Sequence, residues 1–475
     1  MGHHTKKPAA VAFLFDNSIF LIAGAVVALL WANLAPKGYH DFVHLDLLGG
    51  SHAEESHDES GAGGGETTQE GDEQDGDNDS AEEGSEGVDE AADDHGGGGH
   101  HGFTIHFLVN DILMAFFFAI AGKEVWEALL PGGPLSNPRK AATPLLATLG
   151  GIVGPAGVYI AGCMMTNTMD SYGDGWAIPC ATDIAFSYLV ARILFGPGHP
   201  AIAFLLLLAI ADDAAGLIIL AIFYPSGDLA LEWLLLSALG VAIGFAMRKM
   251  KLHSFWWYLV VPGTLSWIGF LKSGIHPALG LVPIIPSLPH AATDLGLFAK
   301  NELNRDDTLN EFEHFLKDPV EIFLGLFGLV NAGVAFSSVG TGTYLVLAGL
   351  LIGKPVGITM MTWIAEKVFG LEVPRGMSYA HVVTLGMIAG IGFTVALFVS
   401  TAAFPPSKAP AEVLDSVKMG ALGSFGAALL SFFIAKALGV KPTGALEEES
   451  DGETSDGEDA AGGGDSENEA ASSDG

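Results

Sequence analysis

Long apolar runs recur from one end of this 475-residue sequence to the other. A membrane-spanning helix needs about 20 predominantly apolar residues, and the sequence contains twelve runs of roughly that size. Hydrophobic residues make up 49% of the chain and charged residues only 16%, whereas soluble domains carry roughly 25% charge. The pattern predicts an all-α membrane protein with about twelve transmembrane helices. Their approximate limits are 12–34, 106–131, 142–166, 177–194, 200–224, 229–248, 254–271, 274–288, 320–338, 343–367, 379–403 and 412–438.

The formal net charge of −34 comes mostly from two appendages to this apolar chain. Residues 49–102 contain 18 acids and residues 446–475 contain 12, and neither segment has a Lys or Arg. Both are rich in Gly, Ser and Glu and lack the apolar residues that a folded core needs. The predicted organisation is a first helix within 1–48, an acidic disordered insert at 49–102, a membrane core at 103–440 and an acidic disordered tail at 441–475.

Five histidines lie among the acids of the insert, and such composition is compatible with metal binding. Their spacing matches no defined site, so a solvated acidic spacer is the favoured interpretation. Acidity of this kind would suit a halophilic organism. The histidines are His52, His57, His95, His100 and His101.

The positions of Lys and Arg predict the orientation in an inner membrane, because cytoplasmic loops carry an excess of both. With the N-terminus inside, 15 of the 21 basic residues fall in inside segments. Both termini are then cytoplasmic and the acidic insert lies outside. The basic start, MGHHTKKPAA, leads into an apolar run that reaches Trp31 with no small-residue cleavage site. We therefore expect a retained first helix rather than a signal peptide.

Two of the apolar runs are poor continuous helices. The segment PCATDIAF at 179–186 places Pro, Thr and Asp within the membrane, and GMIAGIGFT at 386–394 places three glycines there. Interrupted helices in corresponding positions of two halves are typical of the binding site of a secondary transporter. Each is the middle run of a three-helix group, 142–224 or 343–438, as an inverted repeat requires.

Ionisable side chains inside a membrane cost about 2.5 kcal/mol or more each, so they are functional candidates by default. Asp212 and Asp213 are adjacent within a long apolar run, where repulsion and lost hydration favour holding a proton that a small cation can replace. The alternative is that each acid pairs with a Lys to hold the bundle together, but Lys354 alone cannot pair with three acids. For Lys354 we favour a buried partner over snorkelling to an interface. Asp183 could bind the ion or offset helix dipoles.

These segments resemble the NhaA family of sodium/proton antiporters. The resemblance covers nearly all of 12–440, and it implies twelve helices in two inverted five-helix repeats, with two broken helices crossing at the membrane centre. The matching segments are WANLAP with YHDF within 31–42, VNDILMAFFFAIAGKEV at 109–125, ATDIAF at 181–186, LAIADDAAGLIILAIFY at 208–224, LKSGIH at 271–276, LVNAGVAF at 329–336, GLLIGKPVGI at 349–358 and GIGFTVALF at 390–398.

The resemblance also implies roles for individual residues. Asp212 and Asp213 resemble the ion- and proton-binding pair, with Thr182 as a neighbouring polar residue. Lys354 resembles the lysine that pairs with the binding-site acid, and Asp183 the residue that balances the crossed helix ends. Other residues resemble positions linked to the cytoplasmic funnel, pH response or outer-end contacts. They are Asp111, Glu124, Glu313, His314 and His276.

The sequence departs from the family pattern in regions linked to pH response and dimerisation. GKEVWEAL replaces the usual G-L-E-V-K-R-E-L, so Lys123 is new and two basic residues become Trp126 and Glu127. The usual second histidine after Glu313 is replaced within LKDP. The 49–102 insert replaces an outer hairpin that is a dimer contact in relatives. We therefore do not assume the family's pH profile, nor a homodimer formed by that route.

The leading functional hypothesis is electrogenic exchange of cytoplasmic sodium, and lithium by the same chemistry, for external protons, with roles in sodium and pH homeostasis. The expected partners are Na+, H+ and membrane lipid, with no cofactor, no nucleic acid and no enzymatic reaction. One rival is a sodium-coupled solute symporter on a related broken-helix scaffold. Another is a membrane sensor that recruits a partner through its acidic tail. The sequence has no G-x-x-x-x-G-K-[ST] run, which argues against an ATP-driven pump.

Overall fold

The computed structural model describes residues 19–47, 103–290, 307–374, 376–440 and 442, and within them the fold is helical. The predicted acidic insert and nearly all of the predicted tail lie outside the described residues. The first half contains α2 (Ile19–Leu34), α3 (Pro36–Val43), α4 (Ile105–Phe107), the π-helix η1 (Leu108–Leu113), α5 (Met114–Leu129), α6 (Pro138–Thr166), α7 (Met169–Tyr172), the 3-10 helix η2 (Gly173–Cys180), α8 (Ile184–Phe195), α9 (Pro200–Phe223), η3 (Leu231–Trp233) and α10 (Leu234–Lys249). The second contains α11 (Phe255–Tyr258), η4 (Leu259–Gly263), α12 (Thr264–Ser273), η5 (Pro277–Leu279), η6 (Val282–Ser287), α13 (Thr308–Asn331), η8 (Phe336–Ser338), α14 (Thr341–Ala348), η9 (Gly349–Gly353), α15 (Lys354–Lys367), α16 (Tyr379–Ala389), α17 (Phe393–Ala403), α18 (Ala411–Gly423) and α19 (Gly426–Ala437).

Within the described residues, six helices are long and apolar enough to cross a membrane, and the number rises to eight if each of two bent helix pairs forms one span. The prediction of an all-α membrane protein is confirmed. Both predicted interruptions are also confirmed, because α7–η2 meets α8 at a bend of 53° and α16 meets α17 at a bend of 50°. The total of twelve spans stays a prediction.

Two predicted spans differ from the structure, one in the type of helix and the other in its limits. The segment 274–288 forms the short 3-10 turns η5 and η6, in which Pro283 and Pro286 prevent a regular α-helix. The segment 320–338 belongs to α13, which begins at Thr308, where the Asp307 side chain accepts a hydrogen bond from the Asn310 amide at 2.9 Å. The charged first half of α13 looks like a loop in the sequence, but it is helical because its apolar side is buried.

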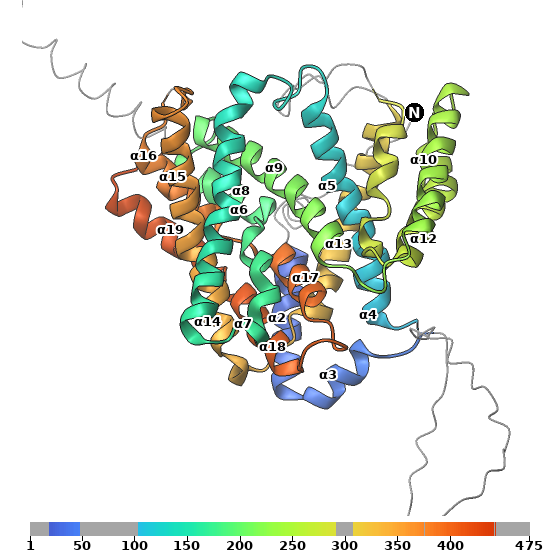
Figure 1. Ribbon diagram of the computed structural model, residues 1–475, viewed down its shortest axis with the longest axis horizontal. Helices are drawn as coiled ribbons and strands as arrows, with labels where there is room; N and C mark the ends of the chain where they lie inside the picture. The colour runs from blue at the N-terminus through green and yellow to red at the C-terminus, as the bar shows by residue number, and fades with distance from the viewer. Residues whose placement is uncertain (1–18, 48–102, 291–306, 375, 441, 443–475) are drawn as a thin grey trace, which may run out of the picture.

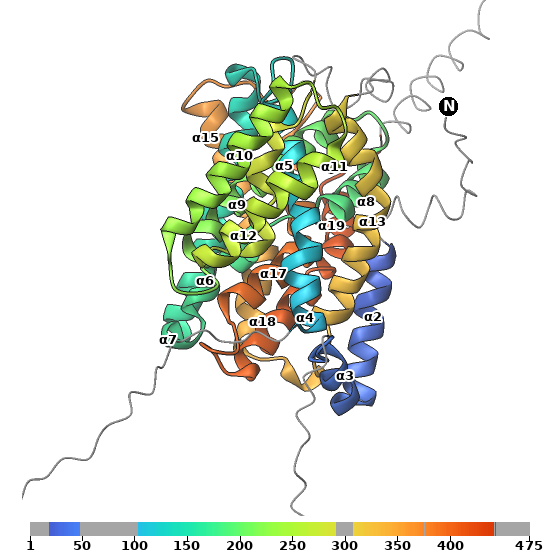
Figure 2. The same ribbon diagram turned by 90° about the vertical axis from the view of Figure 1, so that its right-hand side faces the viewer.

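Glycines allow the main helix pairs to approach closely. A Cβ atom at Gly150 of α6 would collide with the carbonyl of Gly357 of α15, and one at Gly24 of α2 would collide with the carbonyl of Gly325 of α13. Close backbone contact through small residues is the usual way that helices pack where lipid removes the hydrophobic driving force. Figure 2 shows α2 lying alongside α13.

The bundle places the two helix breaks near its centre. In Figure 1, α10 and α12 lie at one edge and α14, α15 and α16 at the other, with α8, α9 and α17 between them. The breaks between α7–η2 and α8, and between α16 and α17, therefore lie beside the middle of α9, which contains the paired acids.

Candidate ion-binding site

The two breaks meet each other directly. The backbone N–H of Asp183 donates to the Ile391 carbonyl at 2.7 Å, and the Ser187 hydroxyl donates to the Ile388 carbonyl at 3.1 Å. At Gly392 a Cβ atom would lie 2.7 Å from the Ala181 carbonyl oxygen, so only glycine fits the crossing. The free backbone groups of each broken helix are thus partly satisfied by the other helix.

Asp183 caps two helices at once. Its Oδ1 accepts from the Phe186 amide at 3.3 Å at the start of α8, and its Oδ2 accepts from the Thr394 amide at 3.4 Å at the start of α17. The Thr394 hydroxyl also donates to Oδ2. A buried carboxylate between two helix N-termini offsets the partial positive charge of both. This geometry favours the dipole-balancing role for Asp183 over direct ion binding.

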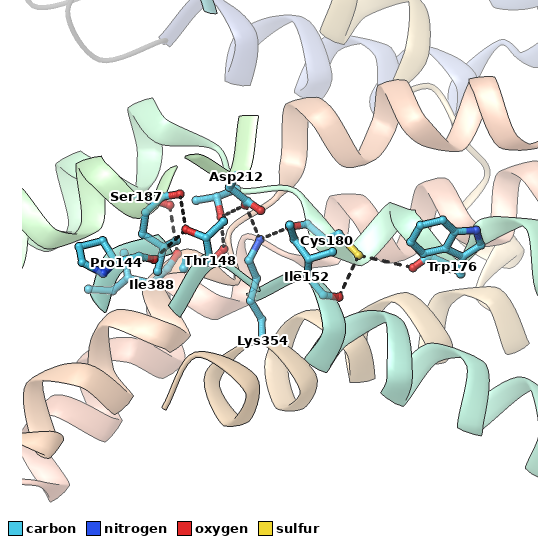
Figure 3. A network of polar contacts seen from close by, with 12 residues as sticks. Pro144, Thr148, Ile152, Trp176, Cys180, Ser187, Asp212, Lys354 and Ile388 are labelled. Carbon is cyan, nitrogen blue, oxygen red and sulfur yellow. Dashed lines mark hydrogen bonds and ion pairs between the residues drawn. The ribbon is translucent and has the colours of Figure 1, made fainter. Parts of the chain in front are cut away.

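Asp212 is fixed in a buried polar network, and Figure 3 shows its contact with Lys354. Its Oδ2 lies 3.0 Å from Lys354 Nζ and accepts from the Thr182 hydroxyl at 2.8 Å. The side chains of Lys354 and Asp212 are 0% and 2% exposed, so the pair is fully removed from solvent. Lys354 Nζ also donates to the carbonyl of Cys180, the last residue of η2. The ammonium therefore neutralises both a carboxylate and a helix C-terminus.

Asp213 faces a different environment from its neighbour. Consecutive residues of an α-helix point about 100° apart, and Asp213 lines a cavity of about 340 Å³ instead of joining the network around Lys354. Carboxylate and hydroxyl oxygens of the kind that bind hard cations gather on its wall. The polar residues that line the cavity are Glu124, Thr182, Asp183, Asp213, Glu313, Lys317, Glu321 and Thr394.

Comparison with known proteins identifies the family. A family model described as Na+/H+ antiporter 1 matches residues 90–435. The chain is 48% identical over 450 residues to the Na(+)/H(+) antiporter NhaA of Jannaschia sp. (strain CCS1), covering 89% of this chain and 96% of that protein. The chain belongs to the NhaA family of Na+/H+ antiporters. The NhaA proteins of Geotalea uraniireducens (strain Rf4) and Geobacter sulfurreducens are 42% and 41% identical, each over 91% of this chain and 98% of theirs.

Membership of the NhaA family makes this chain an ion transporter and not an enzyme. Among the described residues, no group of three or more His, Cys, Asp or Glu side chains could hold a metal ion. Sodium in a transporter is cargo, and a site that must release it on each cycle can use few ligands. The adjacent acids and the Thr182 hydroxyl offer oxygen atoms of the required kind.

An ion cluster adjoins the cavity at Glu313, in the region where the sequence departs from the NhaA pattern. Lys123 Nζ bridges the carboxylates of Glu127 on α5 and Glu313 on α13. Lys123 is 4% exposed, so this contact ties the two helices together below the surface. Glu124 and Glu313 line the cavity, and their link to a funnel or to pH response stays a prediction. Lys123 and Glu127 were noted in the sequence as departures from the family pattern. The structure shows that these two residues compensate each other's charge.

Three further predicted residues lie away from the cavity. Asp111 and His276 are brought together, with 3.8 Å between Oδ1 and Nδ1. The backbone of Asp111 is held by the Trp267 indole N–H at 2.9 Å, and His276 packs against Phe398. His314 is exposed on α13 and does not line the cavity. The prediction for these residues as pH-response or outer-end positions stays untested.

Sequence reasoning missed two kinds of site component. Thr394 ends the glycine-rich segment described in the sequence, but its hydrogen bond to Asp183 was not predicted. Its position directly after the break could have indicated this contact. Glu321 and Lys317 line the cavity and were also missed. Their spacing from Glu313, at successive four-residue steps along α13, places all three on one helix face. The Cys180 carbonyl carries no sequence signal, because every residue has one.

Replacing Lys354 by Ala should lower the free energy of unfolding by about 3–5 kcal/mol, because it leaves the buried Asp212 without its partner. Lys354→Arg should retain part of the stability. The measurement is thermal and denaturant unfolding of the purified protein in detergent. Lys367→Ala is the matched control, since the Lys367 side chain is 54% exposed in its contact with Glu366 and such surface pairs contribute about 0–1 kcal/mol. Equal stability of the wild type and both Lys354 variants would contradict a buried pair.

Proposed function

We propose that this chain exports sodium, and lithium by the same chemistry, in exchange for external protons at Asp212 and Asp213. The observation that carries the proposal is the difference between the surroundings of the two adjacent acids. Asp213 lines the cavity, whereas Asp212 is held beneath it by Lys354 and Thr182. A cation arriving through the cavity meets Asp213 first. To use Asp212 as well, it must displace the Lys354 ammonium or a proton.

The cavities on the two sides of this pair support alternating access. The 340 Å³ cavity reaches Asp213 between α5 and α13. Toward the end of α9, Asp212 borders a pocket of only about 20 Å³, together with Gly216, Leu220 and Val399. This arrangement corresponds to a state open on one side only. Movement of the broken helices would open the other side.

The charges at the site favour electrogenic exchange. Asp212, Asp213 and Lys354 give three groups that can gain or lose a proton, whereas one sodium ion carries a single charge. If entry of one Na+ releases two protons, each cycle moves net charge and is driven by the membrane potential as well as by the proton gradient.

For the topology we propose twelve spans in inverted repeats, an inner-membrane location and cytoplasmic termini. The large cavity then opens to the cytoplasm, because α5 ends and α13 begins on that side. The support is the distribution of Lys and Arg and the matching positions of the two broken pairs.

The direct test of antiport is sodium-dependent proton movement in everted membrane vesicles, which expose the cytoplasmic face. Addition of Na+ or Li+ to respiring vesicles should dissipate the pH gradient, and choline should not. No solute other than the cation should be needed, which separates antiport from the symporter alternative. A response that required an added organic solute would support symport instead.

Cysteine labelling tests the topology. A Ser80→Cys variant should react with an impermeant thiol reagent in intact cells, and a Ser466→Cys variant should react only in everted vesicles. Both positions lie outside the described residues, and the native Cys163 and Cys180 are buried, so background labelling should be low. The opposite pattern of labelling would reverse the proposed orientation.

A further inference from the structure

Three aromatic rings stack at the end of the bundle where α8 ends and where α9 and α16 begin. The ring centroids of Phe195 and His199 lie 5.4 Å apart, and those of His199 and His381 lie 4.8 Å apart. The interplanar angles are 22° and 27°, so the rings are nearly parallel. Phe195 is fully buried and His199 is 9% exposed. Neither histidine belongs to the ion site or to its cavity.

Each histidine caps a helix through the same ring atom. His199 Nδ1 accepts from the Ala201 amide at 3.1 Å at the start of α9, and His381 Nδ1 accepts from the Ser378 amide at 3.1 Å at the start of α16. The Ser378 hydroxyl also lies 2.7 Å from His381 Nδ1. An Nδ1 that accepts must be unprotonated, so both rings are neutral with the proton on Nε2. Protonation would remove both acceptors and place two cations face to face.

Both capped helices lead toward the ion site. Helix α9 contains Asp212 and Asp213, which lie roughly 20 Å from its capped end at 1.5 Å per residue. At the far end of α16, the Ala389 carbonyl lies 3.2 Å from the Thr182 hydroxyl. The stack of His199 on His381 therefore joins the start of α9, which holds the acids, to the start of α16, whose far end contacts Thr182.

We propose that His199 and His381 are positioning residues that hold α9 against α16 only while both rings are neutral, so that acidification of the cytoplasmic side slows transport by separating them. This inference rests on the proposed antiport function and orientation. It places a second pH-dependent step at the cytoplasmic end of the bundle. This step is separate from the competition between protons and sodium at the acids.

The surrounding charges are consistent with neutral rings near pH 7. Burial, followed by the charge of His381, lowers the pKa of His199 below its usual 6.5. Among the described residues, the other titratable groups at this end include Arg192 in the last turn of α8 and Glu366 and Lys367 in the last turn of α15. Glu372 and Tyr379 line a pocket there together with Glu366 and Ser378. Glu366 already accepts from Lys367 and Tyr379. Since the folded state disfavours the protonated ring, stability from the cap is present above about pH 6.5 and is lost as the pH falls below it.

The test uses two replacements that keep the caps but do not titrate near neutral pH. Asn is a favoured N-cap residue, and Gln completes a capping box with Ser378, so His199→Asn and His381→Gln preserve an acceptor at each position. Exchange is measured in everted vesicles at saturating Na+ across a pH series. In the double variant, the acid-side midpoint should move down by about half a pH unit or more, with an unchanged alkaline plateau. The single variants should shift partially.

Two controls separate titration from simple structural damage. His199→Ala and His381→Ala remove the caps at every pH, so they should lower thermal stability and the alkaline plateau together. His253→Asn removes an exposed histidine outside the stack and should leave the profile unchanged. The inference is wrong if the double variant follows the wild-type acid limb, or if His253→Asn shifts it equally.

A separate stability measurement keeps this test distinct from that of the proposed function. If the wild type shows no exchange at any pH, the antiport proposal fails. The histidine stack can still be judged by thermal unfolding in detergent. The wild type should lose more stability than the double variant between pH 7.5 and about pH 5.5, below the usual histidine pKa. Equal losses would overturn the inference.

Discussion

Sodium-driven proton movement should fall to background when Asp213 is replaced by Asn, while the protein stays inserted and folded. Within the described residues, the Asp213 side chain forms no hydrogen bond or ion pair, and it lines the cavity. The substitution therefore removes a titratable ligand without breaking a structural contact. Everted vesicles measure exchange, and thermal unfolding in detergent measures stability.

Asp212→Asn should also stop exchange, but with a different effect on stability. It leaves the ammonium of Lys354 buried without its carboxylate, which costs about 3–5 kcal/mol. Asp170→Asn, an exposed acid in α7, is the control for loss of negative charge and should leave both measurements unchanged. Normal exchange by Asp213→Asn would rule out the proposed mechanism. Equal destabilisation by both replacements would show that Asp213 has a structural role as well.

The parts of the site that could be predicted are those where a residue is energetically unfavourable in its local sequence context. Acids at 212 and 213 and a lysine at 354 stand out in apolar runs because burying a charge in a membrane is expensive. The helix breaks stand out because Pro and Gly disfavour continuous helix. A protein keeps such unfavourable features only where function or structure requires them. The presence of buried charges and helix breaks in one chain therefore indicated a functional site from the sequence alone.

The remaining features depend on three-dimensional placement. The adjacent positions of Asp212 and Asp213 in the sequence could not show that Asp212 joins the network around Lys354 while Asp213 lines the cavity. Nor could the sequence show that His199 and His381, far apart in the chain, stack on each other. The start of α13 was misplaced because a charged segment with one buried face has no long apolar run. The local sequence shows which residues are unfavourable to bury, but only the tertiary packing determines which residues they contact.

The apparent affinity for sodium should rise with pH and then reach a plateau. Asp212 and Asp213 are adjacent and withdrawn from solvent, so both cannot carry full charge without a compensating cation. Sodium entering from the cavity must therefore displace a proton from the pair or from Lys354. Where the site is mostly protonated, each displaced proton should strengthen apparent binding by up to about tenfold per pH unit. Isothermal titration of Na+ into purified protein across a pH series measures this slope.

The variants of the pair decide which group supplies the proton. Asp213→Asn should show no sodium binding at any pH, whereas Asp170→Asn should follow the wild-type slope. Lys354→Gln keeps a polar group beside Asp212 but cannot release a proton, so a smaller slope in that variant would identify Lys354 as one donor. If the slope is unchanged, the proton leaves from the carboxylates alone. An affinity that stays flat from acid to alkaline pH in the wild type would mean that sodium and protons use separate sites, and coupling would then require a relay elsewhere in the bundle.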